Sequence, residues 1–99
     1  MSETKIKEIM NHYGFESQIE IFIEECAEAI QAAQKMKRSN STETAEKAFE
    51  NFIEEIADVI ITAAQMRLYI GETTIDAAID RKLERQLLRI ANETQEEEQ

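Results

Sequence analysis

The seven residues FIEECAE at positions 22–28 recur as FIEEIAD at positions 52–58. The likeness extends over segments 19–36 and 49–66, which align without gaps thirty positions apart and share nine of their eighteen residues. Helical composition alone does not account for so many identities. The repeat therefore predicts two helices that present the same side chains, as a pair related by a local pseudo-twofold axis would.

Composition favours helices throughout the chain. Its 99 residues contain no proline and only two glycines, whereas good helix formers such as alanine and glutamate are abundant. We expect an all-α fold in a single domain over residues 1–92. Residues 93–99 carry four glutamates and no apolar residue, so we expect a disordered, acidic tail there.

Turn and capping residues divide the chain into four expected helices. Gly14 and Gly71 suit the left-handed position that follows a helix. Ser17 is expected to cap the second helix, and Asn40 the third, in a capping box with Glu43. The resulting helices span about residues 4–13, 18–38, 41–70 and 74 or 75 onward. Such short connections predict that the four helices pack as a four-helix bundle-like domain.

Each repeated helix carries two stripes at helical spacing. We expect the more apolar stripe to form the core: Ile19, Phe22, Ile23, Cys26, Ile30 and Ala33 in the first copy, and Phe49, Phe52, Ile53, Ile56, Ile60 and Ala63 in the second. The other stripe holds Glu25 among small and apolar residues, and Glu55 is likewise followed by Val59, Thr62 and Met66. An acid at the edge of buried surface is costly without a partner.

The acids of the repeat are spaced to share an ion. Glu25 and Glu28 lie three residues apart, so their Cβ atoms are roughly 5 to 6 Å apart on one helix face, and the same holds for Glu55 and Asp58. Carboxylate-only ligands favour a hard cation, Mg²⁺ or its substitute Mn²⁺, over zinc. The competing interpretation is an ordinary solvated acidic face.

Charge, hydropathy and cysteine content argue against nucleic acid binding, membrane insertion and a disulfide. The net charge is −10, which disfavours binding to a nucleic acid polymer. No apolar run is long enough to cross a bilayer, and Cys26 is the single cysteine. We therefore expect a cytoplasmic protein with no membrane association and no disulfide.

The combination of Glu25-x-x-Glu28, twenty-six intervening residues and Glu55-x-x-Asp58 resembles the MazG-like nucleotide pyrophosphohydrolases, all-α nucleoside triphosphate pyrophosphatases. The resemblance runs from Tyr13 to Arg89, about three quarters of the chain. It implies cleavage of a nucleoside triphosphate to a monophosphate and pyrophosphate. It also implies a homodimer or a tetramer built from two dimers, and the four motif acids as magnesium ligands.

Other residues are assigned roles in this expected reaction. Glu25 is the candidate to accept a proton from the attacking water. Lys82 and Arg85, three apart on the fourth helix, are candidates for phosphate binding, with a solvated helix flank as the alternative. Gln18 lies on the Glu25 stripe, where its amide could read a base edge; the favoured alternative is a surface residue at the start of the helix. A second hypothesis for the whole chain is a non-catalytic helical oligomerisation module whose acids only solubilise it.

Overall fold

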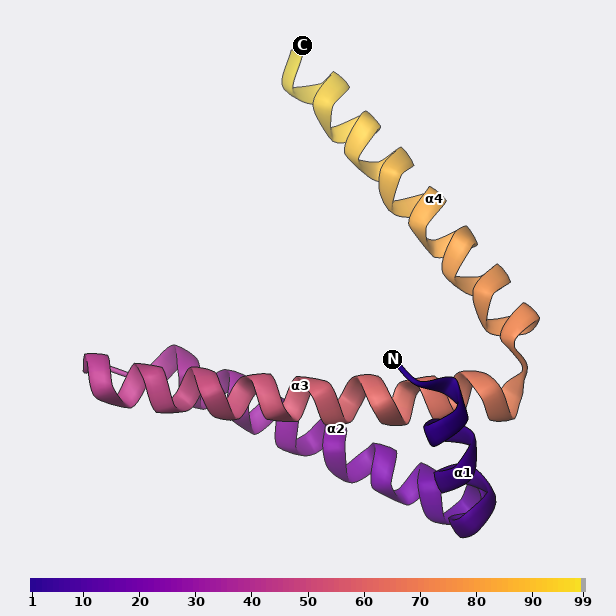
Figure 1. The fold of residues 1–99 in the computed structure, drawn as a ribbon. Helices are drawn as coiled ribbons and strands as arrows, with labels where there is room; N and C mark the ends of the chain where they lie inside the picture. The colour runs from indigo at the N-terminus through magenta and orange to yellow at the C-terminus, as the bar shows by residue number, and fades with distance from the viewer. Residues whose placement is uncertain (99) are drawn as a thin grey trace. The chain divides into compact units, whose positions relative to one another are not determined.

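A computed structural model describes residues 1–98, and within that range it contains four α-helices and no strand. The helices are α1 (Glu3–Tyr13), α2 (Phe15–Arg38), α3 (Thr42–Ile70) and α4 (Glu72–Glu98), drawn in Figure 1. The prediction of an all-α fold is confirmed. None of these helices contains a stretch both long and apolar enough to span a membrane.

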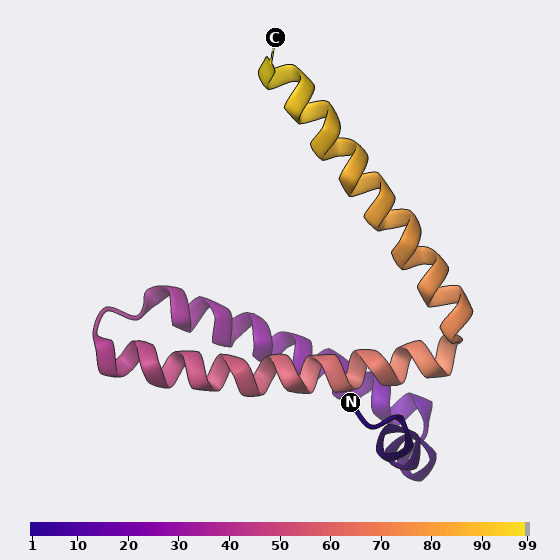
Figure 2. The ribbon, with the colours of Figure 1, turned by 45° about the horizontal axis from the view of Figure 1, so that its top comes forward.

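The described chain forms two compact units, and the single domain expected over residues 1–92 stays a prediction. The first unit is Met1–Tyr69 and contains α1, α2 and nearly all of α3, while the second begins at Ile70 and contains α4. Within the first unit, α2 and α3 run side by side and a short connection joins them (Figures 1 and 2). No residue of α4 is buried, so this helix has no core of its own.

The junction between α1 and α2 is a single residue, Gly14. Its φ of 89° is a conformation that side-chain-bearing residues rarely adopt, and its backbone N–H donates to the Met10 carbonyl at 2.8 Å. Because one glycine turns the chain, α2 starts at Phe15. The expected start near Gln18, with Ser17 as the cap, is therefore wrong.

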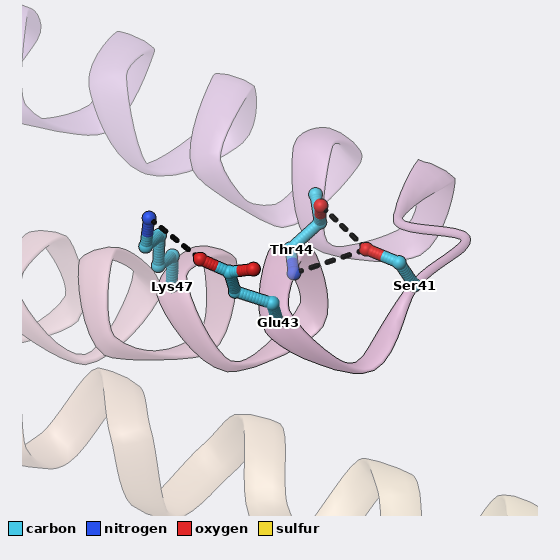
Figure 3. A network of polar contacts seen from close by, with 4 residues as sticks. All are labelled: Ser41, Glu43, Thr44 and Lys47. Carbon is cyan, nitrogen blue, oxygen red and sulfur yellow. Dashed lines mark hydrogen bonds and ion pairs between the residues drawn. The ribbon is translucent and has the colours of Figure 1, made fainter.

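Ser41 caps α3, in place of the predicted Asn40. Its hydroxyl oxygen accepts a hydrogen bond from the Thr44 backbone N–H at 3.2 Å, and the same hydroxyl donates to the Thr44 side chain at 2.6 Å (Figure 3). Glu43 does not reach back in a capping box but pairs with Lys47 at 3.3 Å. Ser41 and Thr44 are three residues apart and Glu43 and Lys47 are four apart, which are the spacings of an N-cap and of an ion pair on one helix face.

The surface between α2 and α3 is the less apolar of the two stripes. Its buried residues are Gln18 and Ala32 on α2 and Ala48, Thr62, Gln65 and Met66 on α3. No residue of the stripe expected to form the core is buried. Half of its residues are half-buried and the other half are exposed, with Ile23 57% and Ile53 51% accessible. A helix in a hairpin can bury one stripe against its partner, and the small side chains of Ala32 and Ala48 let the two helices approach closely.

Helix α1 closes the hairpin at the end opposite to the α2–α3 connection. Ile6 and Met10 are its buried residues. The Tyr69 hydroxyl donates to the Met10 carbonyl at 2.9 Å, and the Tyr69 ring meets Phe15 edge to face with centroids 5.1 Å apart. These contacts tie the first residues of the chain to the end of α3.

Helix α4 begins at Glu72, directly after Gly71 with its φ of 125°, and so starts before the predicted caps Thr73 and Thr74. It continues to Glu98, whereas the sequence predicted a disordered tail from residue 93. Glutamate and glutamine are good helix formers, and adding residues to an existing helix costs much less than nucleating one. Gln99, the last residue of that predicted tail, lies outside the described residues.

Candidate metal centre

Glu25 and Glu55 occupy the middle of the buried surface between α2 and α3. Gln18 and Ala32, both buried, lie seven residues before and after Glu25. Glu55 is flanked in the same way by the buried residues Ala48 and Thr62. Seven residues are close to two helical turns, so each acid shares the inward face with its two flanking residues.

Three of the four predicted ligands converge. Glu25, Glu28 and Glu55 each offer a carboxylate oxygen, and these oxygens lie within 4.8 Å of one another. Glu25 and Glu55 are half-buried and Glu28 is exposed, so the group is open to solvent on one side. Asp58 lies outside this set of three. It is nevertheless close enough to Glu25 to accept a hydrogen bond when Glu25 is protonated.

The two half-buried acids are harder to ionise than ordinary glutamates. The pKa of Glu25 is raised from 4.5 to about 6, first by desolvation and then by repulsion from Asp58 and Glu28. Desolvation likewise raises the pKa of Glu55, followed by repulsion from Glu28. A bound cation would act in the opposite direction and favour the charged carboxylates.

One oxygen of each half-buried acid has no hydrogen-bond partner. Both Glu25 Oε2 and Glu55 Oε2 are buried and unpaired. Unpaired buried oxygens of this kind are costly unless a donor or a cation is close. An all-carboxylate donor set with two buried, unpaired oxygens fits a hard divalent cation such as Mg²⁺ or Mn²⁺.

Gln18 lies inside the hairpin, with 5% of its surface exposed. Gln65 on α3 is 1% exposed, and its Oε1 has no hydrogen-bond partner. Glu25 on α2 lies close to Asp58 on the antiparallel helix α3. Gln18 precedes Glu25 by seven residues and Gln65 follows Asp58 by seven, so the two glutamines lie at the same level of the hairpin. The sequence analysis missed Gln65, although its spacing from Asp58 was the available signal.

Lys82 and Arg85 belong to the second unit, whereas all four acids belong to the first. The two cations line a shallow hollow of about 290 Å³ along α4, together with Gln86, Arg89, Ile90 and Glu93. Their expected spacing on one face of a helix is therefore present. Their role in phosphate binding stays a prediction.

A second set of cations lies beside the acids themselves. A hollow of about 340 Å³ opens between α2 and α3, with Glu28 and Glu55 in its wall. Lys35, Arg38 and Asn51 also line it. The sequence alone does not place Lys35 and Arg38 at this hollow, because their position depends on which side of α2 faces α3.

Comparison with known proteins adds no assignment: no family model, no curated protein and no solved structure matches the chain.

Proposed function

We propose that this protein is a Mg²⁺-dependent nucleoside triphosphate pyrophosphohydrolase. The observation that carries the proposal is the convergence of Glu25, Glu28 and Glu55 within 4.8 Å, with a buried, unpaired oxygen on two of them. The resemblance of the repeated acidic motif to the MazG-like pyrophosphohydrolases supports the choice of substrate. A purely solvating role would not require acids in the middle of a buried seam.

In the proposed reaction, Glu25, Glu28, Glu55 and Asp58 would hold magnesium. A bound ion would neutralise phosphate charge and lower the pKa of a water molecule. Glu25, whose ionised form a bound cation favours, would accept the proton of the attacking water. The water oxygen bonds to the α phosphorus as the bond from that phosphorus to the oxygen bridging the α and β phosphates breaks, and pyrophosphate leaves.

Turnover of a nucleotide panel tests the proposal. Purified protein is incubated with Mg²⁺ and canonical or modified nucleoside triphosphates, and pyrophosphate and monophosphate are quantified. We expect Glu55→Gln to lower turnover by more than about 100-fold, since even outer-shell partners of a metal contribute about 10- to 100-fold. Glu54→Gln, the exposed neighbour, is the matched control and should keep its activity. Absence of turnover, or equal loss in both variants, contradicts the proposal.

We further propose that the active form is a homo-oligomer. The exposed apolar stripe defines the surface: Ile23 and Ile30 on α2 and Phe49, Ile53 and Ile60 on α3, each more than half accessible. Only five hydrophobic residues are buried among residues 1–98, which is few for a stable domain: Ile6, Met10, Ala32, Ala48 and Met66. The stripe repeats at the thirty-residue offset, so it suits the self-complementary contact of a twofold dimer.

This exposed stripe also favours the second candidate function, a non-catalytic oligomerisation module. The two candidates share the expectation of self-association and differ in the role of the acids. The module predicts neither Mg²⁺ binding at Glu25, Glu28 and Glu55 nor nucleotide turnover. Calorimetric titration of the metal-free protein with Mg²⁺, compared with Glu55→Gln, separates them before any substrate is known.

A further inference from the structure

The hollow beside the acids has a composition suited to a metal-bound polyanion. Glu28 and Lys35 both line it and are seven residues apart on α2, which places them on nearly the same side of the helix and roughly 10 Å apart along its axis. Asn51 and Glu55 stand four residues apart on α3 and also line it. Carboxylates thus occupy one end of the hollow, and cationic and amide donors lie toward the α2–α3 connection.

The cations of this hollow are not neutralised by neighbouring acids. Residues 31–42 contain Lys35, Lys37 and Arg38 and no Asp or Glu, in a chain whose net charge is −10. Among residues 1–98, no carboxylate forms an ion pair with Lys35 or Arg38. Lys47, in contrast, is held by Glu43 at 3.3 Å (Figure 3). Two unpaired cations therefore border the same hollow as two of the acids.

There is also room beyond Lys35. A second hollow of about 510 Å³ shares Lys35 and Asn51 with the first and extends toward Thr44 and Ala48. Glu43 and Lys47, which pair with each other at 3.3 Å, also line it. The two hollows adjoin, so an elongated ligand can run from the acids past Lys35 toward the start of α3.

We infer that Lys35 and Arg38 bind the phosphate chain of a magnesium-bound nucleoside triphosphate in this hollow. The inference rests on the proposed function, whose acids hold the metal at the other end of the hollow. Lysine and arginine form charge-assisted hydrogen bonds to phosphate oxygens that the metal leaves free, and the Asn51 amide adds a donor. The charges of the last turn of α2 thereby act on the ligand as well as on the helix dipole.

Binding of inorganic tripolyphosphate tests the inference without any catalytic step. The full chain, saturated with Mg²⁺, is titrated calorimetrically with tripolyphosphate. Lys35→Gln and Arg38→Gln should each weaken binding by about tenfold, the usual value of a hydrogen bond to a charged group. Lys37→Gln is the matched control because it removes the same charge from the same turn but lines neither hollow. Lys35→Arg should restore binding.

Folding and metal loading are checked separately, by circular dichroism and by titration with Mg²⁺ alone, and both should be unchanged in these variants. The inference is overturned if the wild-type protein does not bind tripolyphosphate, or if Lys37→Gln weakens binding as much as Lys35→Gln. Nucleotide turnover is an independent readout. Tripolyphosphate binding that depends on Lys35, without hydrolysis of any nucleotide, would sustain this inference and contradict the proposed reaction.

Discussion

Glu25 and Glu55 lie thirty positions apart in sequence, and each buries its Oε2 atom without a hydrogen-bond partner in the seam between α2 and α3. Each is flanked at seven residues on both sides by buried side chains. The pair therefore couples the stability of the hairpin to its ionisation and to cation binding. The first two predictions concern this coupling.

The metal-free protein should become less stable as pH rises from about 4.5 to 6. Below this range Glu25 is protonated in the folded and the unfolded chain alike. Within it the folded state retains a proton that the unfolded state releases, because the pKa of Glu25 is about 6 when folded and 4.5 when unperturbed. Deprotonation then favours unfolding. In EDTA, the melting temperature should be lower at pH 7 than at pH 4.5.

Glu25→Gln should reduce this decline, whereas Glu24→Gln, a change at an exposed acid, should leave it in place. A decline of the same size in both variants would show that Glu25 is not its source.

Magnesium should stabilise the protein at pH 7.5. At a free concentration ten times its Kd, a ligand that binds only the folded state adds about 1.4 kcal/mol to the free energy of unfolding. For a domain of this size that is roughly 6 to 11 °C in melting temperature. Differential scanning calorimetry should show this shift in the wild type and in Glu54→Gln, and its loss in Glu55→Gln. An equal shift in all three proteins would place the cation elsewhere.

An acid introduced into the exposed apolar stripe should dissociate the proposed oligomer. Ile53→Asp puts a charge where a second copy would bury an isoleucine that is 51% accessible in the single chain. Light scattering after size exclusion should then report the mass of one chain, 11.4 kDa, in place of a multiple of it. Gln31→Asp adds the same charge on the polar face of α2 and should not change the mass. A monomeric wild-type protein would contradict the homo-oligomer.

Removal of the α3 cap should cost about 1 kcal/mol. Ser41→Ala deletes the acceptor of the Thr44 N–H at the start of α3 and so leaves that donor without its capping partner. The melting temperature should fall by roughly 4 to 8 °C. Asn40→Ala, at the position that the sequence favoured as the cap, should have little effect. The reverse order would identify Asn40 as the cap.

The sequence predicted the helices well because their signals are local. Gly14 and Gly71 mark two of the helix ends, and the absence of proline leaves the long segments between them uninterrupted. The boundaries differ where two neighbouring residues could serve as the cap, as Asn40 and Ser41 could. The helical tail was missed because polarity alone does not end a helix that has already formed.

The orientation of α2 and α3 was the less predictable feature. Both stripes of each helix have helical spacing, and apolar content alone favours the stripe with Ile23 and Ile53, none of whose residues is buried in the described chain. Pairing of the acids could be predicted from the repeat itself, since duplicated motifs on antiparallel helices meet near their centre. Lys35 and Arg38 could not be placed beside them, because that depends on which sides of the two helices face each other.

Helix α4 places 27 residues in a regular conformation without burying any of them. Most helices in proteins owe their stability to packing rather than to intrinsic propensity, and every ordered residue carries a cost in chain entropy. A surface that covers Leu83 and Leu87 would therefore supply the free energy that keeps this segment ordered. Dilution of the protein should consequently make α4 the first part to fray, and a protease added at low protein concentration should cut there before it reaches the hairpin.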